Sequence, residues 1–154
     1  MLAWFSCAFS PPGTAPLILQ IYTLQVCIWD TATLNQVLVY NGHQKRRTRS
    51  CGIRACTFSH DSNLVASGGD EMIIRIWSRD TGLDKIVISC ESELIPWCLR
   101  FSADDKRLLA VGGLSQAVFL WDLESKAKLA TLNGHERICQ YAEFSPSGKY
   151  IISC

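Results

Sequence analysis

The 154-residue sequence predicts an all-β fold built from repeated four-stranded antiparallel sheets. Phe-Ser dipeptides that begin at Phe9, Phe58, Phe101 and Phe144 recur at intervals of 49, 43 and 43 residues. A tryptophan follows the first three copies after 20, 19 and 20 residues, at Trp29, Trp77 and Trp121. Between these landmarks short apolar runs alternate with turn residues, which favours strands over helices.

The repeat divides one domain, residues 1–154, into units of about 4–41, 53–90, 95–133 and 138–154. In the second unit strands are expected at Ile53 to Phe58, Asn63 to Ser67, Ile73 to Trp77 and Lys85 to Ser89. In the third unit they are expected at Pro96 to Phe101, Arg107 to Val111, Ala117 to Leu123 and Lys128 to Leu132. The fourth unit contains only its first two strands. The sequence therefore predicts three complete sheets and half of a fourth.

Composition excludes several classes of protein. With 48% hydrophobic residues, 19% charged residues and a net charge of +1, the chain as a whole does not fit intrinsic disorder or wholesale wrapping by nucleic acid. The first 29 residues carry no charge, but they lack the basic start of a signal peptide, and four Pro and Gly residues interrupt the apolar run. No membrane partner is expected.

Eight cysteines without a Cys-x-x-Cys pair, together with three widely separated histidines, give no support for a metal site, and no cofactor is expected. Most of the cysteines lie in apolar runs, where a thiol behaves as a small hydrophobic group. We expect them to be reduced in an intracellular protein, either cytoplasmic or nuclear.

These recurring residues resemble the repeat of the WD-repeat proteins, whose units are the blades of a β-propeller. The matching pairs are Trp29-Asp30, Trp77-Ser78, Trp121-Asp122, Gly42-His43 and Gly134-His135. The resemblance implies three complete blades and half of a fourth. Because a closed propeller has about four to eight blades, it also implies part of a ring, either a fragment or a truncated isoform.

The sequence departs from the family pattern in two units. The first unit reads Leu17 to Thr23 where the family places a Ser-Gly-x-x-Asp stretch, which leaves its second strand poorly defined. In the third unit Val111 stands where the family places serine, and Ser115 where it places aspartate. Gly68-Gly69 and Gly112-Gly113 begin no helix and complete no P-loop, so we interpret them as hairpin turns rather than phosphate cradles.

The resemblance also implies a buried polar network in the second unit. Its members are His43, Ser67 and Trp77, with Glu71 at the position of the usual aspartate. A buried indole N–H and a buried imidazole both need hydrogen-bond partners, which favours a structural role. The same residue types could form a Ser-His-acid triad, but that interpretation needs an exposed nucleophile and an oxyanion hole. We therefore expect no catalytic residue and no enzymatic activity.

One dense cluster of charge follows the first unit, at Lys45, Arg46, Arg47 and Arg49. The segments Gly42 to Gly52, Glu91 to Leu94 and Gly134 to Arg137 connect successive units, and we expect them on one face of the molecule, called the loop face. The second and third segments carry Glu91 and Glu93, and Glu136 and Arg137. The cationic segment either binds an acidic partner or is a solvated insertion, and the sequence leaves both interpretations open.

The leading functional hypothesis is a non-enzymatic scaffold or adaptor that binds protein or peptide partners on the loop face. A narrower alternative is a substrate receptor of a ubiquitin ligase, although Ala32 and Glu124 stand where some such receptors carry an arginine after Trp-Asp. Another alternative is a subunit associated with RNA or ribonucleoprotein, which rests on residues 45–49 alone. Uncovered sheet edges also predict self-association.

Overall fold

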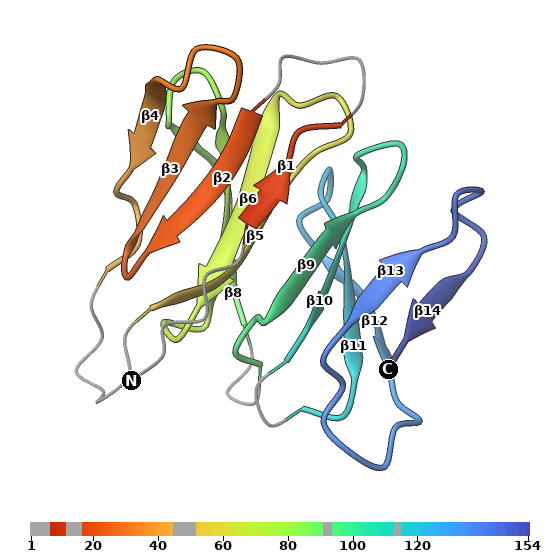
Figure 1. Ribbon diagram of the computed structural model, residues 1–154. Helices are drawn as coiled ribbons and strands as arrows, with labels where there is room; N and C mark the ends of the chain where they lie inside the picture. Colours follow the sequence, from red (N-terminus) through yellow and green to blue (C-terminus); the bar gives the residue numbers. More distant parts are fainter. Residues whose placement is uncertain (1–6, 12–16, 45–51, 91–93, 113–114) are drawn as a thin grey trace.

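A computed structural model describes residues 7–11, 17–44, 52–90, 94–112 and 115–154 (Figure 1). The described residues form strands, turns and loops, and none of them is helical. Three four-stranded sheets and one two-stranded sheet follow one another along the chain. The predicted all-β fold of repeated four-stranded sheets is confirmed.

The first sheet contains β1 (Cys7–Phe9), β2 (Leu17–Tyr22), β3 (Gln25–Asp30) and β4 (Gln36–Tyr40). The second contains β5 (Ile53–Phe58), β6 (Leu64–Gly69), β7 (Ile73–Ser78) and β8 (Asp84–Ser89). The third contains β9 (Cys98–Phe101), β10 (Arg107–Val111), β11 (Val118–Asp122) and β12 (Lys128–Leu132), and the last contains β13 (Ala142–Phe144) and β14 (Ile151–Ser153).

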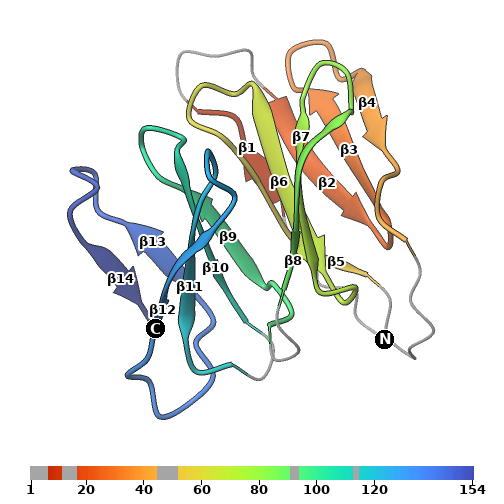
Figure 2. The same cartoon turned by 180° about the vertical axis from the view of Figure 1, so that it is seen from behind.

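Each sheet is a simple meander in which consecutive strands pair antiparallel. The sheets stand side by side in chain order, and their first strands, β1, β5, β9 and β13, are neighbours (Figures 1 and 2). The last strands, β4, β8 and β12, lie at the far edges. This is the arrangement of propeller blades around an axis, and the described sheets form an open arc.

Apolar side chains fill the space between neighbouring sheets. In the second sheet, both faces of β6 and β7 are covered, and Val65, Ile74, Ile76 and Trp77 are fully buried. They pack with residues of the adjacent sheets in continuous clusters. The outer strands β8 and β12 are mostly exposed. Burial on both faces explains why strict polar-apolar alternation is weak in the inner strands.

A β-bulge recurs at the tryptophan of each complete sheet. The pairing register shifts between Ile28 and Trp29, between Ile76 and Trp77, and between Leu120 and Trp121. In each case one residue of the outer strand has no pairing partner in the register of the inner strand; these residues are Val37, Lys85 and Leu129. A bulge bends its strand and increases the local twist. The tryptophan spacing in the sequence therefore marks a repeated backbone irregularity as well as a strand.

Two expectations for local structure need correction or completion. Gly68 and Gly69 lie inside β6 rather than in a hairpin turn. A Cβ atom on Gly69 would lie 2.1 Å from the Gly52 carbonyl oxygen, so this glycine is required by the close approach of β5. In the first sheet the poorly defined second strand is β2, which pairs with both β1 and β3.

Candidate functional site

The structure brings His43, Ser67, Glu71 and Trp77 together between the first two sheets. His43 follows β4, Ser67 lies in β6, and Glu71 lies in the turn before β7. The Trp77 indole Nε1–H donates to Ser67 Oγ at 3.0 Å, and Ser67 Oγ lies 2.6 Å from His43 Nε2. His43 Nδ1 contacts Glu71 Oε1. If Ser67 donates its own proton to Nε2, the Nδ1–H of the same ring donates to the carboxylate.

The Glu71 carboxylate is the charged end of this network. Burial alone raises its pKa, but hydrogen bonds from His43 and from the Gln44 backbone N–H, together with the electrostatic attraction of His43 and Arg75, outweigh burial. The net result is a pKa below the ordinary value. The Gln44 N–H lies 3.1 Å from Glu71 Oε2, and Arg75 Nε lies 3.5 Å from Oε1. Glu71 is therefore ionised at neutral pH.

Tyr40, which the sequence analysis did not single out, connects this network to the first sheet. Its ring stacks on Trp77 with the ring centroids 4.2 Å apart and the planes 5° from parallel. Its hydroxyl donates to Asp84, which also accepts a 2.6 Å hydrogen bond from Arg75 Nη1. Burial and then the Asp84 carboxylate raise the pKa of Tyr40. An aromatic residue shortly before Gly42-His43 was the available signal.

Serine, histidine and carboxylate are connected in the order used by hydrolytic triads, but the hydroxyl is enclosed. Ser67 has 0% of its surface exposed, and its oxygen lies between the Trp77 indole and the His43 ring. A nucleophile needs access to a substrate carbonyl and a nearby oxyanion hole. The arrangement of these atoms instead suits mutual satisfaction of buried polar groups.

The third and last sheets differ from each other at the position of Ser67. Strand register aligns Trp121 with Leu108, as Trp77 aligns with Val65, so Ala110 occupies the position of Ser67. The expectation that Val111 takes that position is wrong by one residue, because Val111 corresponds to Gly68. In the two-stranded sheet Ser153 occupies the serine position, and its Oγ lies 2.8 Å from His135 Nε2. The pair Gly134-His135 thus supplies a second histidine-serine contact.

The aspartates of the two Trp-Asp pairs organise the turns after β3 and β11. Asp30 Oδ1 accepts backbone hydrogen bonds from Ala32 and Thr33 at 2.8 and 2.9 Å. Asp122 Oδ1 accepts the Ser125 backbone N–H at 2.7 Å. These bonds lower the pKa of both carboxyl groups. Both aspartates therefore act locally on the turn rather than in the buried network.

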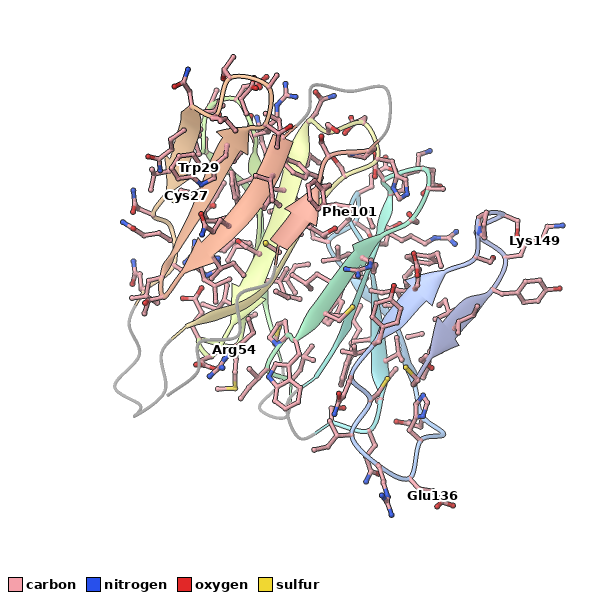
Figure 3. The ribbon with its side chains drawn as sticks, viewed as in Figure 1. Cys27, Trp29, Arg54, Phe101, Glu136 and Lys149 are labelled. Atoms are coloured by element: carbon pink, nitrogen blue, oxygen red, sulfur yellow. The ribbon has the colours of Figure 1, made fainter. Side chains whose placement is uncertain are left out.

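Most of the charged candidates for partner binding lie outside the described residues: Lys45, Arg46, Arg47, Arg49, Glu91 and Glu93. Glu136 and Arg137 are described, exposed and located in the loop between β12 and β13. Glu136 and Arg54 lie toward the same end of the sheets, whereas Lys149 lies at the opposite end (Figure 3). Arg54 is paired with Asp70 through two 2.9 Å hydrogen bonds.

Trp97 is an exposed aromatic residue at the same end that the sequence analysis missed. Phe58 and Phe101 are the equivalent last residues of β5 and β9. Trp97 precedes Phe101 by as many residues as Arg54 precedes Phe58, so the two occupy equivalent positions, and Trp97 lies immediately before β9. The residue is 42% exposed, while its backbone N–H donates to the Val111 carbonyl at 2.8 Å. Gly112, at φ +131°, lies so close that an added Cβ would approach Trp97 Cβ to 2.7 Å. The indole is thus presented from a fixed backbone.

Within the described parts of the chain, no group of three or more His, Cys, Asp or Glu side chains is arranged to hold a metal ion. Over the same residues, no helix is long and apolar enough to cross a membrane.

Comparison with known proteins identifies the family. A model of the family described as "WD domain, G-beta repeat" matches residues 34–78 and 126–154. Protein SPA1-RELATED 3 of Arabidopsis thaliana is 32% identical over 129 residues, which cover 83% of this chain and 14% of the relative. Protein FIZZY-RELATED 3 of Arabidopsis thaliana is 33% identical over 128 residues, covering 77% of this chain and 26% of the relative. The B-type cell cycle switch protein ccs52B of Medicago truncatula is 32% identical over 128 residues, with the same coverage.

The repeated sheets, the Trp-Asp turns and these matches agree, and the chain belongs to the WD-repeat proteins. It spans 14% and 26% of the length of the two Arabidopsis relatives.

Proposed function

We propose that this chain is a non-enzymatic interaction scaffold that binds a protein or peptide partner on the loop face. The observation that carries the proposal is the exposed Trp97 indole on a backbone fixed by Gly112. Aromatic side chains that are already ordered lose little conformational entropy on binding and are frequent hot spots in interfaces. The WD-repeat family and the enclosed hydroxyl of Ser67 support binding rather than catalysis.

The test is affinity capture from cell extract with the parent chain, Trp97→Ala and a control, Leu129→Ala. Leu129 is also an exposed hydrophobic residue, but it lies on the outer strand β12. We expect Trp97→Ala to reduce recovery of partner proteins at least about tenfold, which is the effect of a hot-spot residue. Equal recovery with Trp97→Ala and Leu129→Ala would contradict binding at this position.

The basic segment Lys45 to Arg49 is proposed to contribute steering toward an acidic partner. Four cations within five residues, set against the acidic Glu91 and Glu93, would polarise the rim of the loop face. Replacing Lys45, Arg46, Arg47 and Arg49 together by alanine should slow association and flatten its dependence on salt. If the quadruple variant and the parent associate at the same rates across a salt series, the segment is a solvated insertion that does not bind the partner.

Two narrower roles remain alternatives. A ubiquitin-ligase receptor would recover ligase subunits in the same capture experiment, and one relative is named a cell cycle switch protein. A ribonucleoprotein role would give salt-dependent retention of RNA by residues 45–49. Ligase subunits absent from the captured set would exclude the first, and RNA retention unchanged in the quadruple-alanine chain would exclude the second.

Self-association is a second candidate, favoured by large exposed apolar side chains on the first and last sheets. Phe9, Tyr150 and Ile152 are 72%, 71% and 68% exposed. Ile152 occupies the position of Ala66, which is fully buried in the second sheet. We expect light scattering of the 154-residue chain to report oligomers, and Ile152→Glu to reduce them. A stable monomer at micromolar concentration would exclude this behaviour.

A further inference from the structure

A cavity of about 760 Å³ opens beside the first strands of all four sheets. Its wall includes the ends of these strands and the turns that follow them, so it lies at the end of the sheets opposite the loop face. Phe101 belongs to this wall, and Figure 3 shows it well separated from Glu136 of the loop face. The volume is in the range of pockets that enclose small ligands or peptide side chains.

The repeat explains which side chains meet there. Thr57, Arg100 and Glu143 each precede the phenylalanine of a Phe-Ser pair, so they stand at the same level on the neighbouring strands β5, β9 and β13. All three line the cavity. The rest of the wall is largely aromatic and apolar, and includes Phe9, Pro11, Phe58, Phe101, Phe144 and Pro146. Thr57, Arg100 and Glu143 thus form one polar level, and His60, Tyr141 and Ser145 are the other polar residues of the wall.

Arg100 is held in place by an aromatic ring and a backbone carbonyl. Its guanidinium lies over the Tyr141 ring, 5.0 Å from the centroid, and its Nη1 donates to the Leu99 carbonyl at 2.8 Å. The Tyr141 hydroxyl donates to Glu143 Oε2 at 2.6 Å. Among the described residues, no ion pair includes Arg100. The Tyr141 side chain also hydrogen-bonds to Arg100, and Glu143 attracts it. The remaining N–H donors of this half-buried guanidinium can meet an anionic ligand.

We propose that this cavity binds an acidic peptide segment, with a carboxylate on Arg100 and a neighbouring apolar side chain against the aromatic wall. A carboxylate matches the planar guanidinium in a bidentate geometry. Its single negative charge suits one arginine beside Glu143, whereas a phosphate group would bring up to about two charges against that carboxylate. The site is separate from the loop face and does not depend on Trp97.

The experiment measures fluorescence anisotropy of the 154-residue chain with three labelled hexapeptides. The first is Gly-Leu-Asp-Phe-Pro-Gly with an amidated C-terminus, and the second replaces aspartate by asparagine. The third has the asparagine and a free C-terminal carboxylate. We expect the aspartate peptide to bind at least about tenfold more tightly than the amidated asparagine peptide, as charge-assisted bonds allow. Tight binding of the third peptide would identify a C-terminal carboxylate as the preferred source.

Arg100→Gln should abolish the preference for the carboxylate, whereas Arg107→Gln should preserve it, because Arg107 is exposed on β10 and absent from the cavity wall. Glu143→Gln should strengthen binding several-fold by removing a like charge, and it provides a second test if Arg100→Gln fails to fold. Trp97→Ala should leave binding unchanged, which separates this site from the loop face. Equal binding of the aspartate and amidated asparagine peptides, including binding of neither, would overturn the proposal.

Discussion

Trp77 and Trp121 occupy equivalent positions in neighbouring sheets, yet their surroundings differ in polarity. Around Trp77 the indole N–H, a serine hydroxyl, an imidazole and a carboxylate form a connected chain of contacts. Around Trp121 the serine position is Ala110, and the tryptophan packs in a cluster of apolar residues. Tyr40 of the preceding sheet stacks on Trp77, whereas Ile88, at the equivalent position of the next sheet, belongs to the same apolar cluster as Trp121.

The difference shows that one backbone repeat accepts two kinds of interior. A polar interior stabilises a fold only when every buried donor and acceptor has a partner, because a partly satisfied network is worse than an apolar one. An apolar interior depends on volume and shape, and it loses stability gradually as atoms are removed. Variants of the second and third sheets should therefore respond differently to deletion of polar atoms.

The largest expected effect follows deletion of the tryptophan itself. Trp77→Ala should lower the free energy of unfolding by about 3 to 5 kcal/mol, because it removes a fully buried ring and leaves Tyr40 and Ser67 without their partner. Trp121→Ala should lower it by less, since its stack on Phe119 is looser, with centroids 5.9 Å apart and planes 25° from parallel, and its serine position is occupied by Ala110. Chemical denaturation monitored by circular dichroism provides the comparison. A larger loss for Trp121→Ala would reverse the proposed order of the two sheets.

Deleting the imidazole tests the polar network more selectively. His43→Ala should cost on the order of 1 to 3 kcal/mol, because Ser67 and Glu71 stay buried without their partner. His60→Ala is the matched control, because that imidazole is half exposed, and its backbone N–H bond to Asp105 survives the change. If His43→Ala melts like the parent chain in a thermal scan, the network does not stabilise the fold.

Sequence reasoning found the strands and the tryptophans more readily than the neighbours of each side chain. Strands β5, β10 and β12 match their expected bounds, because turn residues delimit them clearly. Grouping His43 with Ser67 relied on the family resemblance. The alignment of Ala110, in contrast, requires pairing registers, which a sequence with bulges does not reveal.

The sequence also did not predict the contacts between side chains of different repeats. Tyr40 reaches Trp77, and Arg100 reaches Tyr141, across sheet boundaries. Such contacts depend on how neighbouring sheets are offset and twisted, which no local pattern encodes. A polar residue within an inner strand, as in Leu99-Arg100-Phe101, was the one available signal for the cavity.

The pH dependence of stability should be a further difference between the second sheet, which contains Glu71, and the third sheet. The pKa of Glu71 is below its ordinary value of about 4.5 in the folded chain. Its ionised form therefore contributes stability above that value, and the contribution is lost as the pH falls through the lower pKa of the folded state. Glu71→Gln should be less stable than the parent at pH 7, and the gap should narrow below about pH 4. Parallel stability curves for the two chains from pH 7 to pH 3 would contradict the ionic role of Glu71.

The smallest expected effect comes from making the interface between the first and second sheets resemble the interface between the second and third sheets. Tyr40→Phe keeps the ring stacked on Trp77 and removes only the hydroxyl that donates to Asp84. Asp84 is partly exposed and keeps its bond from Arg75 Nη1, so the loss should be about 1 kcal/mol. Tyr40→Ile should cost more, because Trp77 is stacked on an aromatic face that a branched aliphatic chain does not reproduce. Urea denaturation of both variants measures how much the hydroxyl and the ring each contribute to the free energy of unfolding. Equal losses would assign the whole effect to the hydroxyl, and the two interfaces would then differ in hydrogen bonding rather than in packing.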